Sequence, residues 1–179
     1  MKVLLHACCG PCASACVPRL AAASHSVSLF FSNSNIDTRD EFMRRAEALM
    51  TLADHDGVPA IVDAYDHAAW LDTAARGYET APERGARCER CFRYNLSRAA
   101  AYAAANGFDA FTTSLTVSPH KPSPLIFSVG ASVAPIFLPV DFKKQDGFLC
   151  SVRRAKELVH RNITKRRPDS RRLRTSKIA

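Results

Sequence analysis

Short apolar runs with strand character alternate with helical stretches along most of the chain. The expected strands cover residues 3–7, 27–31, 60–62, 111–115 and 136–140. The expected helices cover residues 12–23, 38–57, 66–75, 89–105, 125–133 and 147–160. Strands that alternate with helices favour a mostly parallel sheet with helices on both faces. We therefore predict an α/β fold, a Rossmann-like three-layer domain with a mostly parallel sheet.

Two of the expected helices carry recognisable ends. Thr38 and Glu41 have the spacing of a capping box, and Gly57 follows the last apolar position of the same helix. Asn106 and Gly107 close the helix 89–105. The inner faces are expected at Phe42, Ala46, Leu49, Met50 and Ala53 in the first helix and at Phe92, Leu96, Ala99, Ala100 and Ala103 in the second.

Length and charge distribution favour one domain with a basic tail. At 179 residues the chain suits one ordinary α/β domain, which we place at residues 1–158. The tail is placed at 159–179, and residues 160–179 hold eight Lys or Arg and one acidic residue. The rest of the chain is nearly neutral, so net charge alone does not indicate that the folded part binds nucleic acid.

The seven cysteines point to metal or redox chemistry. No run approaches the roughly 20 apolar residues of a membrane span, and the chain opens on a strand-like segment instead of a signal peptide. We therefore expect a cytoplasmic protein with no membrane partner. In that reducing compartment, clustered cysteines are seldom a disulfide framework.

Five cysteines gather at two places in the expected fold. Cys8, Cys9 and Cys12 lie where the first strand passes into the first helix, at the sheet edge where ligands collect. Cys88 and Cys91 are three residues apart at a helix start, where the helix dipole favours thiolates. We predict a four-thiolate metal site made by Cys8, Cys9, Cys88 and Cys91. The alternative is that these cysteines are small buried hydrophobic residues.

The adjacent pair Cys8 and Cys9 favours an iron-sulfur cluster over one tetrahedral zinc, because the irons of a cluster are more widely spaced. Cys12 has three open interpretations: a further ligand, a redox thiol or a packing residue. Cys16 and Cys150 are expected to be structural. His6 is expected to be a hydrogen-bonded core histidine.

Two polar groups are candidates for substrate binding. The first surrounds the second cysteine pair and combines cations with an aromatic ring, as an RNA groove does: Arg87, Arg90, Arg93, Tyr94 and Arg98. The second is a loop after the strand that ends in Thr112, Thr113 and Ser114, and it offers Ser118, His120 and Lys121 to a phosphate or other polar substrate. A solvated helix face and a solvated loop are the alternatives.

Several ordered motifs resemble one known family. The segments 5–12, 87–95, 112–115 and 118–121, together with 141–144 and 147–148, resemble the QueH-type epoxyqueuosine reductases. The resemblance covers about residues 1–158. It implies a cobalamin-independent iron-sulfur oxidoreductase that reduces the epoxide of epoxyqueuosine in tRNA, the last step of queuosine synthesis.

The resemblance also implies roles for the cysteines. Cys8, Cys9, Cys88 and Cys91 match the family's [4Fe-4S] ligands, and Cys12 matches its third N-terminal cysteine, a candidate catalytic residue. An additional mononuclear iron near the cluster is a further implication. The implied partners are tRNA carrying epoxyqueuosine and an electron donor of unknown identity, and we expect a monomer.

The chain departs from the family after its last predicted helix. Members typically close with a Cys-Gly-Cys motif that forms a redox-active disulfide, whereas no cysteine follows Cys150 here. The abrupt basic stretch resembles a shifted reading frame, and a native RNA-binding tail is the alternative. We expect such a chain to bind a cluster and to reduce epoxyqueuosine poorly.

Two other functions remain open from the residues alone. One is a nucleotide-activating tRNA-modifying enzyme on a similar fold, although the segment 8–12 is no glycine-rich phosphate loop. The other is a non-catalytic zinc module that binds RNA. ATP binding would favour the first, and one zinc without sulfide would favour the second.

Overall fold

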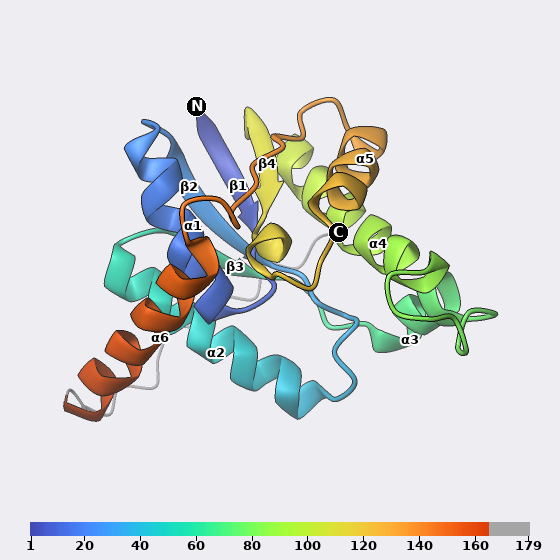
Figure 1. The fold of residues 1–179 in the computed structure, drawn as a ribbon, viewed down its shortest axis with the longest axis horizontal. Helices are drawn as coiled ribbons and strands as arrows, with labels where there is room; N and C mark the ends of the chain where they lie inside the picture. Colours follow the sequence, from blue (N-terminus) through green and yellow to red (C-terminus); the bar gives the residue numbers. More distant parts are fainter. Residues whose placement is uncertain (165–179) are drawn as a thin grey trace.

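Four parallel strands form the centre of the molecule (Figure 1). The structure is a computed structural model that describes the backbone of residues 1–164 and the side chains of residues 1–158. The strands are β1 (Lys2–His6), β2 (Ser26–Phe31), β3 (Ala60–Val62) and β4 (Ala110–Thr113), in the order β3-β2-β1-β4. All three pairings are parallel, and Leu5 lies beside Leu29 on one side and Thr112 on the other.

Helices cover both faces of this sheet (Figure 1). They are α1 (Gly10–Ala22), α2 (Arg39–Asp56), α3 (His67–Trp70), α4 (Ala86–Ala105), α5 (Ser123–Val133) and α6 (Gly147–Thr164). A π-helical turn, Leu71–Ala75, continues α3, and a 3₁₀ turn, Ser114–Val117, follows β4. The predicted Rossmann-like, three-layer α/β fold with a parallel sheet is therefore confirmed.

Side chains on the two faces of β1 pack into two separate hydrophobic cores. Val3 and Leu5 are buried with α1 and α2, whereas Leu4 is buried with α4 and α5 on the opposite face. This alternation is the period of two that a strand imposes on its side chains. Because both faces are covered, the middle of β1, Val3–Leu5, is an uninterrupted apolar run, as is typical of a central parallel strand.

Helix α2 begins and ends where the sequence predicts. Thr38 Oγ1 accepts a hydrogen bond of 3.3 Å from the Glu41 amide, and Gly57 ends the helix in the left-handed conformation with φ 66°. Only half of the capping box forms, because the Glu41 carboxylate pairs with Arg44 and Arg45 instead. The inner face differs at one position: Leu52 is buried, whereas Met50 is half-buried.

The predicted fifth strand, 136–140, is wrong as a strand and shrinks to one bridge. Phe137 pairs with Phe111, and the Leu138 amide donates to Phe111 O at 2.7 Å. Pro139 has no amide hydrogen, so the ladder cannot continue. The fourth strand is also shorter than predicted, because the chain turns into the 3₁₀ helix at Ser114.

Helix α6 packs on α1 and α2. Arg154 donates to Ser14 O at 2.9 Å and to Asp56 Oδ1 at 2.6 Å. The predicted boundary between the domain (1–158) and the basic tail (159–179) falls within this helix, and the division stays a prediction. Of the basic tail, residues 165–179 lie outside the described residues, as do the side chains of 159–164. Among the described helices, none has both the length and the apolar character needed to cross a membrane.

Candidate metal centre

The first cysteines lie at the carboxyl end of β1, where the chain turns into α1. Cys9 is the N-cap of α1, in extended conformation, and Pro11 occupies the first turn, where its missing amide hydrogen costs nothing. Gly10 lets α1 approach α2, since a Cβ there would lie 2.9 Å from Ala48 O. A short local segment therefore fixes how these thiols are presented.

Three thiols meet at this turn. The sulfur atoms of Cys8, Cys9 and Cys12 all lie within 4.8 Å of one another, and 4.0 Å separates the sulfurs of Cys8 and Cys9. All three are free, half-buried thiols. Cys12 therefore belongs to this thiol group and also packs against the hydrophobic core, and its role as a ligand or redox thiol stays a prediction.

The three thiols do not ionise alike. Hydrogen bonds from the Cys12 and Cys9 thiols hold the pKa of Cys8 well below its usual range, and Lys121 and Ser114 lower it further against the effect of burial. The Cys12 thiol also lowers the pKa of Cys9. The hydrogen bond between Cys9 and Cys8 and the burial of Cys9 outweigh this effect and raise the pKa of Cys9 to about 12. The bonds to Cys8 and Cys9, and then burial, raise the pKa of Cys12.

Negative charge is thus favoured on Cys8 and disfavoured on Cys9 and Cys12. Ionising all three at this spacing requires a cationic partner, because like charges in a partly buried site repel strongly. A metal ion or cluster supplies that positive charge and displaces the remaining protons. The donor set therefore fits a thiolate-bound metal group.

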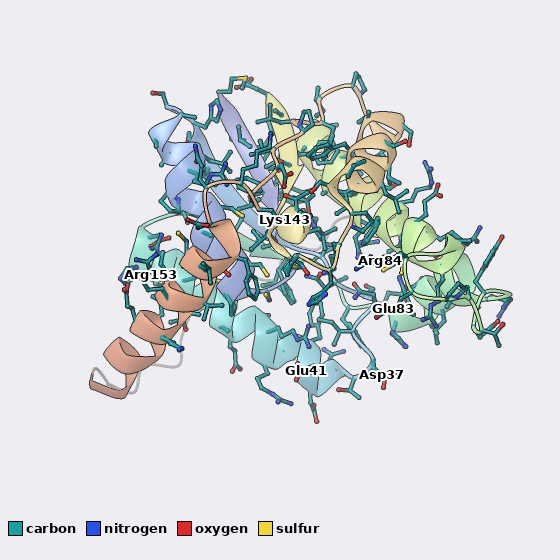
Figure 2. The ribbon with its side chains drawn as sticks, viewed as in Figure 1. Asp37, Glu41, Glu83, Arg84, Lys143 and Arg153 are labelled. Atoms are coloured by element: carbon teal, nitrogen blue, oxygen red, sulfur yellow. The ribbon has the colours of Figure 1, made fainter. Side chains whose placement is uncertain are left out.

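The second pair begins α4. Cys88 and Cys91 lie in its first turns after the N-cap Gly85. The Arg84 amide (Figure 2) donates to Cys88 Sγ at 3.3 Å, and Asn95 Nδ2 donates to Cys91 Sγ at 3.8 Å. Burial raises the pKa of Cys91. Both sulfurs therefore already accept hydrogen bonds of the kind that orient metal ligands.

One cysteine of each group packs against the α4 side of the sheet, whereas Cys12 packs against the core on the opposite side. Cys8 and Cys88 pack against the same hydrophobic core, and Lys121 acts electrostatically on both Cys8 and Cys91. Within the described chain, the group of thiols within 4.8 Å of one another contains Cys12 and neither Cys88 nor Cys91. The four-ligand set of Cys8, Cys9, Cys88 and Cys91 stays a prediction.

The remaining cysteines and His6 have structural surroundings. Cys16 is fully buried and its thiol lies 3.3 Å from Cys12 O. Cys150 is half-buried near the Arg153 guanidinium. His6 is fully buried, with Nδ1 bonded to Thr113 Oγ1 at 2.9 Å and Nε2 to Ser32 O at 3.1 Å. Burial lowers its pKa, so it is a neutral core histidine, as expected.

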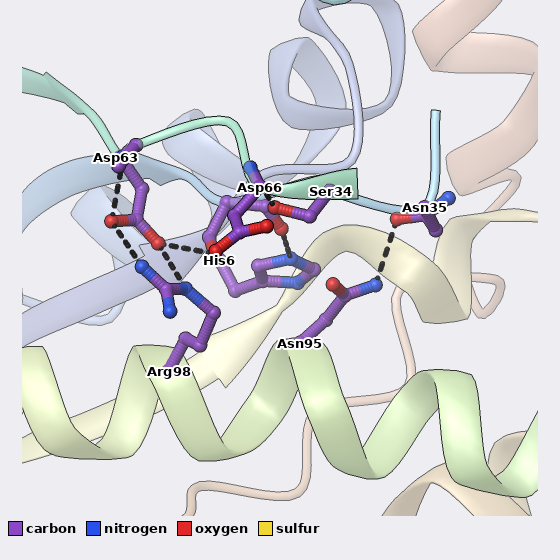
Figure 3. A network of polar contacts seen from close by, with 9 residues as sticks. His6, Ser34, Asn35, Asp63, Asp66, Asn95 and Arg98 are labelled. Atoms are coloured by element: carbon purple, nitrogen blue, oxygen red, sulfur yellow. Dashed lines mark hydrogen bonds and ion pairs between the residues drawn. The ribbon is translucent and has the colours of Figure 1, made fainter. Parts of the chain in front are cut away.

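A polar network ties α4 to the loops after β2 and β3 (Figure 3). Arg98 donates to both carboxylate oxygens of Asp63, at 2.5 and 2.8 Å, and Ser32 Oγ donates to Asp63 at 2.7 Å. Asn95 Nδ2 donates to Asn35 Oδ1 at 3.0 Å. This network sets the position of the helix that carries the second cysteine pair.

Sequence reasoning missed the role of Asp63, Ser32 and Asn35. The available signal was the polar loop 32–35 directly after a buried strand, at the edge where parallel strands present their functional residues. Arg98 was expected on an RNA-binding face, but its guanidinium is committed to Asp63.

The predicted substrate residues divide between two hollows. A groove of about 670 Å³ along α4 is lined by Tyr78, Arg90, Arg93, Tyr94 and Arg98 among others. A smaller cavity of about 300 Å³ includes His120 and Lys121. Arg87 and Ser118 line neither: Arg87 donates to Glu79 O at 3.1 Å, and Ser118 Oγ accepts from the His120 amide at 3.3 Å.

Comparison with known proteins gives one consistent result. The family described as "Epoxyqueuosine reductase QueH" matches residues 3–161. A protein of that name from Streptococcus pyogenes serotype M1 is 35% identical over 165 residues, which cover 87% of this chain and 64% of that protein. Its namesake from Thermotoga maritima is 32% identical over 165 residues, covering 87% of this chain and 82% of that protein.

Relatives differ in length from this chain. The Histophilus somni protein of the same name is 39% identical over 120 residues, covering 67% of this chain and 49% of that protein. The chain thus spans about half to two thirds of the streptococcal and Histophilus relatives. The match nevertheless includes both cysteine groups, the loop 118–121 and most of α6. The chain belongs to the QueH family.

Proposed function

We propose that this chain is an oxidoreductase that reduces epoxyqueuosine to queuosine in tRNA, as a cobalamin-independent iron-sulfur enzyme. The observation that carries the proposal is the group of three thiols within 4.8 Å of one another at the carboxyl edge of the sheet. Family membership supplies the substrate, through the name that the relatives share. The edge of the sheet is where open α/β folds bind their ligands.

The proposed cofactor is a [4Fe-4S] cluster held by Cys8, Cys9, Cys88 and Cys91. Thiolates are the ligands that such clusters take, and the two cysteine groups, of which Cys8 and Cys88 pack against the same core, would supply four of them. When bound, the cluster supplies low-potential electrons. An additional mononuclear iron would need a thiol beyond these four, and Cys12 is placed to provide it.

The reaction sets demands that the surrounding residues meet. Removal of the epoxide oxygen breaks two C–O bonds and consumes two electrons and two protons, so that an alkene and water result. The electrons come from a separate donor. We assign substrate positioning to the cations and polar groups that flank the thiols: Arg87, Arg90, Arg93, Tyr94, Ser118, His120 and Lys121.

The test combines metal analysis with a tRNA assay. The protein is purified without oxygen, its iron, sulfide and zinc are measured, and it is then incubated with a chemical reductant and tRNA from cells that lack epoxyqueuosine reductases. We expect equal amounts of iron and sulfide, and conversion of epoxyqueuosine to queuosine in the hydrolysed tRNA. A colourless, iron-free protein would refute the proposal.

The same measurements judge the two other functions. One zinc per chain without sulfide would support a zinc module that binds RNA, which the close spacing of three thiols also permits. Nucleotide activation is disfavoured by the turn after β1, where a Rossmann-like nucleotide site needs glycines and this chain presents cysteines. Tight ATP binding would reverse that judgement.

A further inference from the structure

A basic cavity lies beside the candidate metal centre. Its volume is about 300 Å³, and the residues that line it include Arg84, His120, Lys121, Ser123, Asp141 and Lys143. Arg84 and Lys143 are labelled in Figure 2. The loop 119–124 contributes three prolines to its wall, so part of the wall has little conformational freedom.

The positive charge in the basic cavity exceeds the negative charge. Asp141 is the one acidic residue in its lining, and its Oδ1 accepts from Ser123 Oγ at 3.1 Å and from the Lys143 amide at 3.2 Å. Lys143 Nζ is fixed by the carbonyl oxygens of Ser118 and Lys121. Within the described part of the chain, no carboxylate pairs with the side chain of Arg84 or Lys121.

The basic cavity and the thiols share two residues. Arg84 lines the cavity with its side chain, while its amide donates to Cys88 Sγ at 3.3 Å. Its backbone has φ 66°, a left-handed conformation that an arginine adopts only when its surroundings impose it. Lys121 lines the cavity and acts electrostatically on Cys8 and Cys91. An anion in the cavity therefore lies next to the thiols.

We propose that the basic cavity binds one backbone phosphate of the tRNA, next to the nucleotide that is reduced, through Arg84 and Lys121. The inference rests on the proposed function for its ligand. A phosphodiester carries the charge that two unpaired cations attract, and a guanidinium suits its paired oxygens. Arg84 and His120 are exposed, so a phosphate that stays attached to a long RNA can reach them.

Two other roles for these cations make different predictions. They could balance the negative charge of metal-bound thiolates, in which case their removal would affect metal content and leave RNA affinity unchanged. They could also bind the phosphates of a free nucleotide, which would then compete with RNA at low concentration. The experiment must separate these three outcomes.

The test measures the affinity of the iron-loaded protein for an anticodon stem-loop RNA without epoxyqueuosine, at several salt concentrations. We expect Arg84→Gln and Lys121→Gln each to weaken binding about tenfold at low salt, since each removes a charged hydrogen bond. The slope of log K against log salt should fall by about 0.7 to 0.9, the value for one phosphate. The slope for the double variant should also fall by no more than about 0.7 to 0.9, because both side chains bind the same phosphate.

The variants are chosen to leave the thiol site intact. Arg84→Gln keeps the backbone amide that bonds to Cys88, and iron content is measured for each protein. Lys156→Gln is the matched control, because this exposed lysine on α6 changes net charge equally and lies outside the cavity lining. Equal losses in the control and the cavity variants would overturn the proposal.

The other possible outcomes also test the phosphate site. Unchanged RNA affinity, or an affinity loss that only parallels a loss of iron, overturns the phosphate site. Competition by micromolar ATP assigns the cavity to a nucleotide and overturns the proposal as well. Because the RNA lacks the modified base, the binding result is independent of reductase activity: an inactive protein with the predicted salt dependence would refute the proposed function alone.

Discussion

The two cysteine groups of the candidate centre are positioned in different ways. Cys8 and Cys9 lie between β1 and α1 and Cys12 lies in the first turn of α1, so the five consecutive residues 8–12 determine their spacing. Cys88 and Cys91 depend on where α4 lies, and contacts with distant segments set that position, among them the pair Arg98–Asp63. The first group is a local structure, and the second is a product of tertiary packing.

This difference teaches what each group needs in order to work. A local triad survives changes elsewhere in the fold, provided that β1 and α1 form. The α4 pair requires the network that joins α4 to the loops after β2 and β3 (Figure 3). Damage to that network should therefore separate the two groups while the triad keeps its geometry.

The largest effect is expected from removing a thiol. Cys8→Ala and Cys88→Ala should each abolish the iron-sulfur absorption of the anaerobic protein, because each removes one of the four proposed ligands. Cys16→Ala is the control, since this buried thiol lies one turn beyond the triad, and its iron content should stay near that of the unchanged protein. Full iron content in Cys88→Ala would contradict the claim that both cysteine groups hold the metal, because the triad alone would then bind it.

The next effect concerns the network under α4. Asp63→Ala leaves the Arg98 guanidinium without its partner, and breaking this partly buried pair costs about 1–3 kcal/mol of unfolding free energy. Urea denaturation measures this loss, and iron content should fall as α4 loses its anchor. Glu89→Gln is the control: it breaks the exposed Glu89–Arg93 pair on the same helix and should cost less than about 0.5 kcal/mol. Equal costs would mean that α4 does not depend on Asp63.

Local signals explain what the sequence could predict. The first strand, the cap at Thr38 and the stop at Gly57 depend on neighbouring residues, and all three predictions were confirmed. The expected strand 136–140 failed because Pro139 has no amide hydrogen to continue the pairing with Phe111 that Phe137 and Leu138 begin, and this proline is itself a local signal in the sequence.

Long-range contacts explain what the sequence could not predict. The sequence predicts Arg98 as an exposed cation on its helix. Its ion-pair partner, Asp63, lies 35 residues earlier in the chain, and no pattern within the helix indicates that contact. The meeting of Cys8 and Cys9 with Cys12 follows from the turn itself, whereas the basic cavity needs residues from the segments 84, 119–124 and 141–143. Only the folded chain brings these segments together.

A moderate effect tests the local group. Gly10→Ala places a Cβ 2.9 Å from Ala48 O, a backbone atom that moves only if α1 and α2 separate. Overpacking of this kind costs about 1–3 kcal/mol, which thermal denaturation detects. Gly107→Ala separates this clash from the loss of a glycine as such, because open space surrounds that position and only its φ of 63° is strained. An unchanged triad reactivity toward alkylating reagents in Gly10→Ala would show that the turn, and not the helix contact, fixes the thiols.

The smallest effect tests the link between the local triad and β4. Ser114 Oγ accepts from the Cys8 amide at 3.0 Å and donates to Cys8 Sγ at 3.3 Å, so Ser114→Ala leaves a half-buried amide unpaired and costs about 1 kcal/mol. Loss of the bond to sulfur should also lower the reduction potential of the bound cluster, because hydrogen bonds to sulfur stabilise the reduced state. Thr112→Val is the matched control: this buried hydroxyl has no hydrogen-bond partner among the described residues, so its removal should neither lower stability nor move the potential. If Ser114→Ala changes neither stability nor the potential, the bonds from Ser114 are dispensable and the turn alone positions Cys8, which sharpens the contrast between the two cysteine groups.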